Sequence, residues 1–177
     1  MLPFPPARRG EYMSTTADIT DNGPSKVERF RPSRTRQSGP TRVTDVVELY
    51  VPHAHGAELV RFIHQGLDLR IVKDASASIN VPQTVFLHWS GIKPHNLKRR
   101  AKSGTLSAAE GESALRVMRV YEAAVNLFEG DTDAAKSWLE TPAPALGGTK
   151  PGDLLHSETG AVEVMDLITR IEYGVYS

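Results

Sequence analysis

The sequence contains no cysteine. This absence excludes disulfide bonds, iron–sulfur clusters, cysteine-ligated zinc sites and a thiol nucleophile. The chain also lacks the roughly 18 uninterrupted apolar residues that a membrane span requires. Its start is interrupted by Pro3, Pro5 and Pro6, which is unlike the apolar core of a secretory signal. We therefore expect a cytoplasmic protein with no membrane partner.

Net charge is absent as well, because 21 Lys and Arg balance 21 Asp and Glu. The balance hides an uneven distribution. Residues 1–44 carry eight basic and four acidic side chains, residues 45–106 carry eight and five, and residues 107–177 carry five and twelve. A basic first half and an acidic last third predict two unlike partner surfaces on one chain.

The sequence contains none of the common catalytic or nucleotide-binding motifs. There is no Gly-x-Ser-x-Gly elbow, and the pair Gly147-Gly148 lacks the following Lys-Ser/Thr of a phosphate loop. His53 and His55 have a spacing that suits a metal ion, but no third ligand lies at a fitting distance along the chain. We predict no catalytic residue, no metal site and no cofactor, and hence a protein that is not an enzyme.

Residues 1–44 are rich in Arg, Ser, Thr, Pro and Gly and poor in large apolar groups, which predicts a disordered basic arm. The apolar residues 46–51 then predict a short strand or an extended approach to the first helix. Beyond Pro52 the spacing of apolar residues is helical to the end of the chain. We expect an all-α fold, a helical bundle preceded by the arm.

The longest predicted helix follows Ser107 and Glu110, a capping-box pair, and carries an apolar stripe at spacings of three and four up to Gly130. Asp131 should cap a shorter helix. The other expected helices cover residues 57–65, 67–79, 83–89, 94–102 and 160–173, with a single turn after residue 151. These elements divide the chain into an arm (1–44), a first helical region (45–106) and a second (107–177).

Residues 82–102 have the order of a degenerate helix-turn-helix: a short helix, a turn with Gly91, and a helix that ends in cations. In this motif the second helix enters the major groove of DNA while Lys and Arg contact phosphates. Asn96 would read a base, since its amide can pair with adenine. The same cations also fit a solvated helix end, where positive charge is favourable. The candidate DNA contacts are Lys93, His95, Asn96, Lys98, Arg99, Arg100 and Lys102.

The last third carries specific sequence matches in residues 135–142, 145–155, 159–164 and 167–176, including Trp138, Gly147-Gly148 and Gly174. These segments resemble the toxin-binding domain of the Xre/MbcA/ParS antitoxin family, over residues 131–177. The preceding residues 66–130 resemble, more loosely, the Xre-like helical region that accompanies that domain.

The resemblance implies a partner and a mode of action. Such antitoxins pair with RES-domain toxins, which consume NAD or use it to ADP-ribosylate a target, and the C-terminal end of the antitoxin covers the NAD pocket of the toxin. They are typically homodimers within a hetero-oligomeric complex and repress their own operon by binding operator DNA. The resemblance assigns toxin binding to Glu172, Tyr173, Gly174, Val175, Tyr176 and Ser177, the last four forming the plug.

The residues themselves leave a second interpretation open. The chain would then be a stand-alone helix-turn-helix transcriptional regulator whose C-terminal domain only dimerises or senses a ligand. Large apolar side chains such as Trp138, Leu139 and Leu155 are expected in the core in either case.

Overall fold

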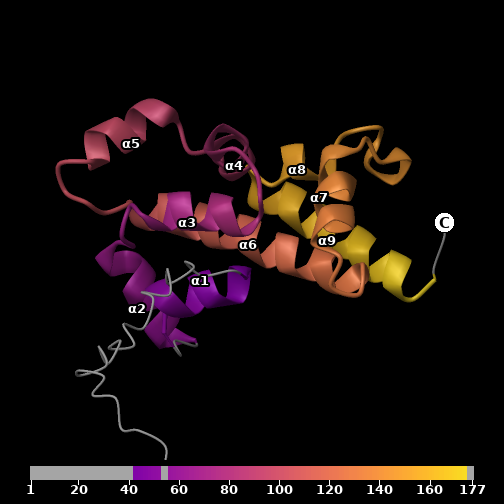
Figure 1. Cartoon of the computed structure of the whole chain (residues 1–177), viewed down its shortest axis with the longest axis horizontal. Coiled ribbons are helices and arrows are strands. Elements are labelled where there is room, and N and C mark those ends of the chain that lie inside the picture. The colour runs from indigo at the N-terminus through magenta and orange to yellow at the C-terminus, as the bar shows by residue number, and fades with distance from the viewer. Residues whose placement is uncertain (1–41, 53–55, 175–177) are drawn as a thin grey trace, which may run out of the picture. The chain divides into compact units, whose positions relative to one another are not determined.

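The computed structural model describes residues 42–52 and 56–174, all of which belong to one compact unit of the chain. In this described part the chain forms nine α-helices and one short 3-10 helix, and its β-type pairings are isolated bridges (Figure 1). The predicted all-α fold is therefore confirmed there. The predicted disordered arm lies outside the described residues, except for its last three: Arg42 caps the first helix, and residues 43 and 44 belong to it.

The first helix, α1 (Val43–Tyr50), occupies the position where we expected a strand or an extended segment. Val43 and Val46 are both buried, because a spacing of three residues places them on the same helical face. Asp45 Oδ2 accepts a hydrogen bond from the backbone nitrogen of Arg42 at 3.2 Å and caps the first turn. The prediction was wrong because packing and capping outweigh the strand preference of valine.

The next helices are α2 (Ala57–Gln65), which agrees with the prediction, and α3 (Ile71–Ser78), which is shorter than the expected helix. The backbone before α3 is paired with a later segment instead. The Leu67 carbonyl accepts from the Leu106 nitrogen at 2.8 Å, and the Leu69 nitrogen donates to the Gly104 carbonyl at 2.9 Å. These bonds replace helical ones, so α3 begins later.

Two short helices follow, α4 (Gln83–Ser90) and α5 (Pro94–Arg100), close to their predicted bounds. Pro94 is the first residue of α5, a position where the missing N–H of proline loses no hydrogen bond. Gly91 ends α4 with a φ of +69°, a left-handed conformation that glycine adopts without a steric penalty.

The long helix α6 (Ala108–Leu127) begins at the predicted capping box. Ser107 Oγ accepts from the Glu110 nitrogen at 3.3 Å, and Glu110 Oε2 accepts from the Ser107 nitrogen at 2.9 Å. Arg100 Nε donates to the same carboxylate at 3.1 Å. Burial would raise the pKa of the Glu110 carboxyl, but the Ser107 hydrogen bonds and the charge of Arg100 outweigh burial and hold that pKa below its usual value.

The chain ends with α7 (Thr132–Glu140), the 3-10 helix η1 (Pro144–Leu146), α8 (Pro151–Leu154) and α9 (Glu158–Glu172). Asp131 caps α7 as predicted, since its Oδ1 accepts from the backbone nitrogens of residues 133 and 134. α9 begins two residues earlier than expected because Ser157 caps it.

The core is organised around α6, which packs against α1, α2, α3 and α4 as well as α7 and α9. Ala114, Met118 and Tyr121 of the predicted apolar stripe are buried, and Val125 and Phe128 are half-buried. No helix of the described residues is both long enough and apolar enough to cross a membrane.

Gly160 supplies a test of this packing. It lies in the first turn of α9, where an added Cβ would overlap the backbone carbonyl of Leu154. Replacing glycine by alanine inside a helix normally stabilises it by about 0.5–1 kcal/mol. We expect Gly160→Ala instead to lower the free energy of unfolding by about 1–3 kcal/mol, because the overlap of the new methyl group with the Leu154 carbonyl outweighs the gain in helix propensity. Urea denaturation measures the change, with the exposed Thr159→Ala as a near-neutral control; a stabilised Gly160→Ala protein would contradict the packing.

The lowered pKa of Glu110 predicts a pH dependence. A carboxyl whose pKa is lower in the folded state stabilises the fold when ionised, so its contribution is complete above the unfolded pKa and is lost as the pH falls through the folded pKa. We expect Glu110→Gln to be less stable than wild type at neutral pH and to lose less stability between about pH 5 and pH 3. Urea denaturation across this range tests it, and identical pH profiles would refute it.

Candidate functional site

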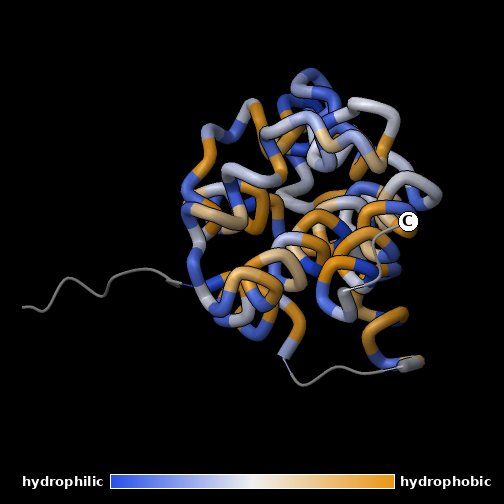
Figure 2. Tube along the Cα trace, turned by 90° about the vertical axis from the view of Figure 1, so that its right-hand side faces the viewer, coloured by the Kyte–Doolittle hydropathy of each residue, from blue (hydrophilic) through white to orange (hydrophobic). Residues whose placement is uncertain are grey.

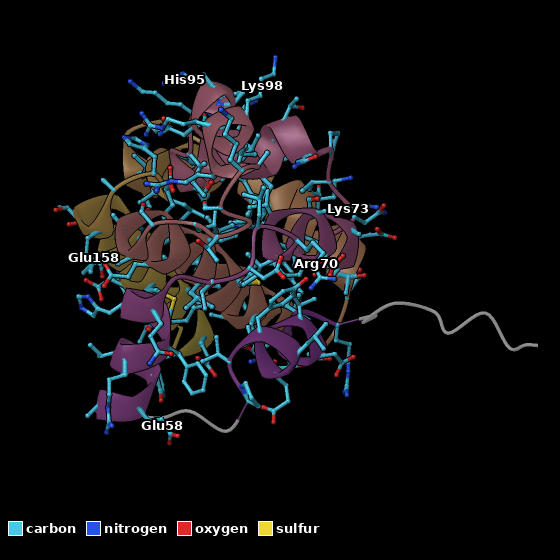
Figure 3. The ribbon with its side chains drawn as sticks, turned by 90° about the vertical axis from the view of Figure 1, so that its left-hand side faces the viewer. Glu58, Arg70, Lys73, His95, Lys98 and Glu158 are labelled. Atoms are coloured by element: carbon cyan, nitrogen blue, oxygen red, sulfur yellow. The ribbon has the colours of Figure 1, made fainter. Side chains whose placement is uncertain are left out.

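The segment predicted to bind DNA forms an exposed, cationic end of the molecule. α4, the turn with Gly91 and α5 follow one another in the predicted order. Figure 3 shows His95 and Lys98 at this end, pointing away from the helices of the core. Of the candidate contacts, Lys93, His95, Lys98, Arg99 and Lys102 are exposed, whereas Asn96 and Arg100 are half-buried.

Arg100 and Asn96 also have partners within the chain. The Arg100 side chain is 33% exposed and forms its ion pair with Glu110, which fastens the end of α5 to the start of α6. Asn96 Oδ1 accepts a hydrogen bond from Arg99 Nη2 at 3.3 Å. The exposed cations therefore make this end of the molecule positively charged, while Arg100 holds α5 in place.

A second helix pair, α3 and α4, packs closely and was not identified from the sequence. The two helices contact each other across the turn from Ile79 to Pro82, in which Asn80 has a φ of +56°. Short turns of this kind join the helices of helix-turn-helix units. The sequence predicted both helices, with residues 80–82 between them, but it did not indicate that the two helices pack as such a unit. On α4 the side chains of Gln83, Thr84 and His88 are exposed.

The same helix α4 contacts the last third of the chain. His88 Nε2 lies 3.0 Å from Asp153 Oδ1 of α8. Beside this pair, a Cβ on Gly152 would lie 2.5 Å from Nε1 of Trp89, so only glycine allows the indole ring to approach α8 this closely. The helix-turn-helix region and the C-terminal region thus share a packed interface.

Arg116 of α6 holds the corner between α8 and α9. Its Nε donates to the Leu155 carbonyl at 3.0 Å, and its Nη2 donates to the His156 carbonyl at 3.3 Å. Its Nη1 forms an ion pair with Glu158 at 3.1 Å. The guanidinium satisfies carbonyl groups that helix α8 leaves open at its end, so α9 starts at a fixed position on α6.

α9 carries the end of the chain to which toxin binding was assigned. Glu172, Tyr173 and Gly174 are exposed, and 75% of the Tyr173 surface is accessible. Gly174 has a φ of +68°, which turns the backbone away from the helix axis. Of the expected plug, Val175, Tyr176 and Ser177 lie outside the described residues.

The surface of α9 is acidic, in agreement with the segment charges. The helix has one cation, Arg170, and four carboxylates, all of them exposed: Glu158, Glu163, Asp166 and Glu172. Beside α9 lies an apolar groove of about 580 Å³, lined by Trp138, residues 141–145, Leu167 and Ile171. The sequence placed Trp138 in the core and treated the prolines as helix breaks. Leu139 and Leu155 are in the core as expected, but Trp138 is half-buried and lines the groove.

Nothing in the described part of the chain gathers metal ligands. No group of three His, Asp or Glu side chains there is suitably placed to hold a metal ion. The candidate pair His53 and His55 lies outside the described residues.

Two family models match this chain. The model of the antitoxin Xre-like helix-turn-helix domain matches residues 58–119. The model of the antitoxin Xre/MbcA/ParS C-terminal toxin-binding domain matches residues 123–174. The boundary between the two matches falls inside α6.

Named relatives agree with these matches. The chain is 38% identical over 131 residues to the Antitoxin Xre of Yersinia enterocolitica (serotype O:8 / biotype 1B), covering 73% of this chain and 88% of the relative. It is 34% identical over 149 residues to the Antitoxin Xre of Photorhabdus laumondii subsp. laumondii, covering 84% and 98%. A Sphingobium protein named Prs ADP-ribosylating antitoxin is 27% identical over 133 residues, covering 70% and 84%.

These findings confirm the resemblance in the sequence, for both the helix-turn-helix region and the C-terminal domain. They also give the chain the domains of an antitoxin, a regulatory protein that binds a toxin. The chain belongs to the Xre/MbcA/ParS family of antitoxins, which act in toxin–antitoxin systems.

Proposed function

We propose that this antitoxin neutralises a RES-domain toxin, one that consumes NAD or uses it to ADP-ribosylate a target, by covering the NAD pocket of the toxin with its C-terminal end. The observation that carries this proposal is the exposure of Glu172, Tyr173 and Gly174 at the end of α9, a helix with an acidic surface in the matched toxin-binding domain. The complex would form in the cytoplasm and contain a homodimer of the antitoxin.

Charge and chemistry support the proposal. An NAD pocket holds two phosphate groups, so donors and cations are expected around it, and an acidic helix complements such a surface. The name of the Sphingobium relative includes ADP-ribosylation, a reaction in which NAD is the donor.

The proposal predicts the effect of shortening the chain. Expressed alone, the protein of the adjacent reading frame should arrest growth and deplete cellular NAD or modify a target, and the full-length chain should prevent both. A variant that lacks residues 174–177 should fail to protect, because the pocket stays open. Growth and NAD concentration are the measurements.

The matched control is Val162→Ala, which changes an exposed residue of the same helix α9 outside the plug and should protect like wild type. Full protection by the shortened variant would refute the plug. A neighbouring protein that is harmless by itself would favour the alternative, a stand-alone transcriptional regulator.

We further propose that the antitoxin represses its own operon through its cationic end. Lys93, His95, Lys98, Arg99 and Lys102 would contact phosphates, and Asn96 would read a base, with Arg100 bracing the helix. A homodimer carries two such ends, and linked binding sites raise affinity for a paired operator. The packing of α3 against α4 supports a variant of this proposal, in which Gln83 and Thr84 of α4 face the bases.

Binding to the promoter DNA separates these two versions. We expect Lys98→Ala and Arg99→Ala each to weaken binding to any DNA and to reduce the slope of log affinity against log salt by about one, since each phosphate contact releases counterions. The control is Arg119→Ala, which removes an exposed cation of α6 outside the cationic end.

If α4 reads the bases, the double variant Gln83→Ala, Thr84→Ala will reduce the preference for promoter over random DNA and leave the salt slope unchanged. Equal wild-type affinity for promoter and random DNA would refute specific repression.

A further inference from the structure

The chain that leads into α1 carries a run of arginines outside both family matches, which begin at residues 58 and 123. Arginine occupies positions 29, 31, 34, 36 and 42, and neither an acidic residue nor a lysine occurs between Glu28 and Asp45. We call residues 29–41 the arginine segment. The described part of the chain begins directly after it, at Arg42, so the structure shows where the segment joins the folded body.

The composition of the arginine segment indicates a polar, anionic partner. The helices of the described part alternate hydrophobic and hydrophilic stretches, because each helix buries one face (Figure 2). The arginine segment has a single large apolar side chain, Phe30, and therefore little to bury in a protein core. Its guanidinium groups attract anions instead, and a narrow minor groove of DNA is a site of strong negative potential that accepts arginine.

The segment joins the body beside one end of the helix-turn-helix unit. α1 packs against α3, and Arg42 and Thr44 line the same pocket as Ser78, the last residue of α3. The turn after Ser78 leads to Gln83 and Thr84, the exposed first residues of α4. The arginine segment therefore leaves the body near the end of α3 and the turn before α4, whereas the cations of α5 follow the other end of α4.

The charges at this junction favour contacts farther out along the segment. Arg42 Nη2 forms an ion pair with Asp45 Oδ1 at 3.2 Å, and Glu122 lines the same pocket as Arg42. Arg42 is thus neutralised, and the Glu122 carboxylate would repel a phosphate there. A cation does lie at the turn, because Lys136 Nζ donates to the Asn80 carbonyl at 2.9 Å. DNA bound at α4 would accordingly be contacted by the arginines beyond the junction and not by Arg42.

The arginines of the segment can reach a neighbouring groove. Arg36 stands six residues before Arg42 and Arg31 eleven residues before it, so an extended chain carries them up to about 20 Å and about 35–40 Å from the junction. The minor groove next to an occupied major groove lies about 17 Å away, half of a helical turn of roughly 34 Å. Domains that read the major groove with a helix can place a basic N-terminal arm in this groove.

We propose that the arginine segment binds the minor groove of operator DNA beside the major groove that α4 occupies, with Arg31, Arg34 and Arg36 as its contacts. This inference rests on the proposed repression, in the version in which Gln83 and Thr84 of α4 face the bases. The segment adds affinity that depends on salt, and it favours A·T-rich flanks, where the minor groove is narrow.

The test measures binding of the full chain to promoter duplexes over a range of salt concentrations. For the triple variant Arg31→Ala, Arg34→Ala, Arg36→Ala we expect a dissociation constant about tenfold or more higher at moderate salt, and a slope of log affinity against log salt smaller by about two to three. The control is the double variant Arg8→Ala, Arg9→Ala, in the same arm but more than 30 residues before α1. It should bind like wild type, because a long tether lowers the effective concentration of these residues at the DNA.

Contact with the minor groove has a readout of its own. The base pairs that flank the site are changed to A·T, I·C or G·C, since I·C keeps the minor-groove pattern of A·T whereas G·C adds an amino group there. We expect the wild-type chain to bind the A·T and I·C duplexes about equally and the G·C duplex several-fold more weakly. The triple variant should not distinguish the three.

Three results would overturn the proposal. One is wild-type affinity and slope in the triple variant. Another is equal wild-type affinity for the three flanks, which would leave contacts to phosphates alone. The third is a triple variant that binds promoter DNA like wild type but loses affinity for the protein of the adjacent reading frame, because the segment would then bind the toxin.

The outcomes also separate this inference from the proposed repression. A wild-type chain that does not prefer promoter over random DNA overturns both. A preference that depends on Gln83 and Thr84, combined with an affinity that the three arginines do not affect, overturns the inference alone. Dependence on the arginines without dependence on Gln83 and Thr84 overturns the placement beside α4. Dependence on both sets supports a segment that lies in the groove next to α4.

Discussion

The burial of α6 is the interaction on which the rest of the structure depends. Its residues form the common core of α1 to α4 and of α7 and α9, so the two functional parts of the antitoxin are built on one uninterrupted helix. The two family matches end at residue 119 and begin at residue 123, within this helix. A domain boundary inside a buried helix cannot act as a hinge, because the helix would have to break and expose its core face.

Local signals in the sequence located most of the fold, because they act over three or four residues. The capping box at Ser107 and Glu110 and the cap at Asp131 satisfy backbone groups at a helix start, and Pro94, the first residue of α5, lacks the N–H that would be left unpaired there; all three were correctly predicted. α1 was missed because its valines are ambiguous until their buried face is known. The start of α3 was misplaced because its competitor is the backbone near residue 105, which is distant in the sequence.

The candidate sites show the same difference between local signals and contacts that join distant parts of the sequence. The cationic residues of α5 and the end of α9 were proposed as contacts from the sequence, since charge and chain position are visible in it. The apolar groove beside α9 was not predicted, because it forms only when Trp138, the loop after α7 and two residues of α9 come together. The interface of α4 with α8 was hidden for the same reason. Nothing in the sequence marks the role of Gly152, which leaves room for the indole ring of Trp89.

The net charge of zero is the sum of oppositely charged parts of the chain, two of which meet at the interface between α4 and α8. Residues 45–106 carry an excess of three basic side chains and residues 107–177 an excess of seven acidic ones, and α6 and the α4–α8 contact hold these two parts together. If the proposed functions hold, the opposite net charges would attract DNA and the toxin to different parts of one body, and each part would repel the partner of the other. α4 contributes to both parts, since it packs against α3 in the helix-turn-helix unit and against α8 beside the toxin-binding surface. The helix-turn-helix part and the toxin-binding part are therefore joined through the packing of Trp89 against Gly152 as well as through the continuous helix α6.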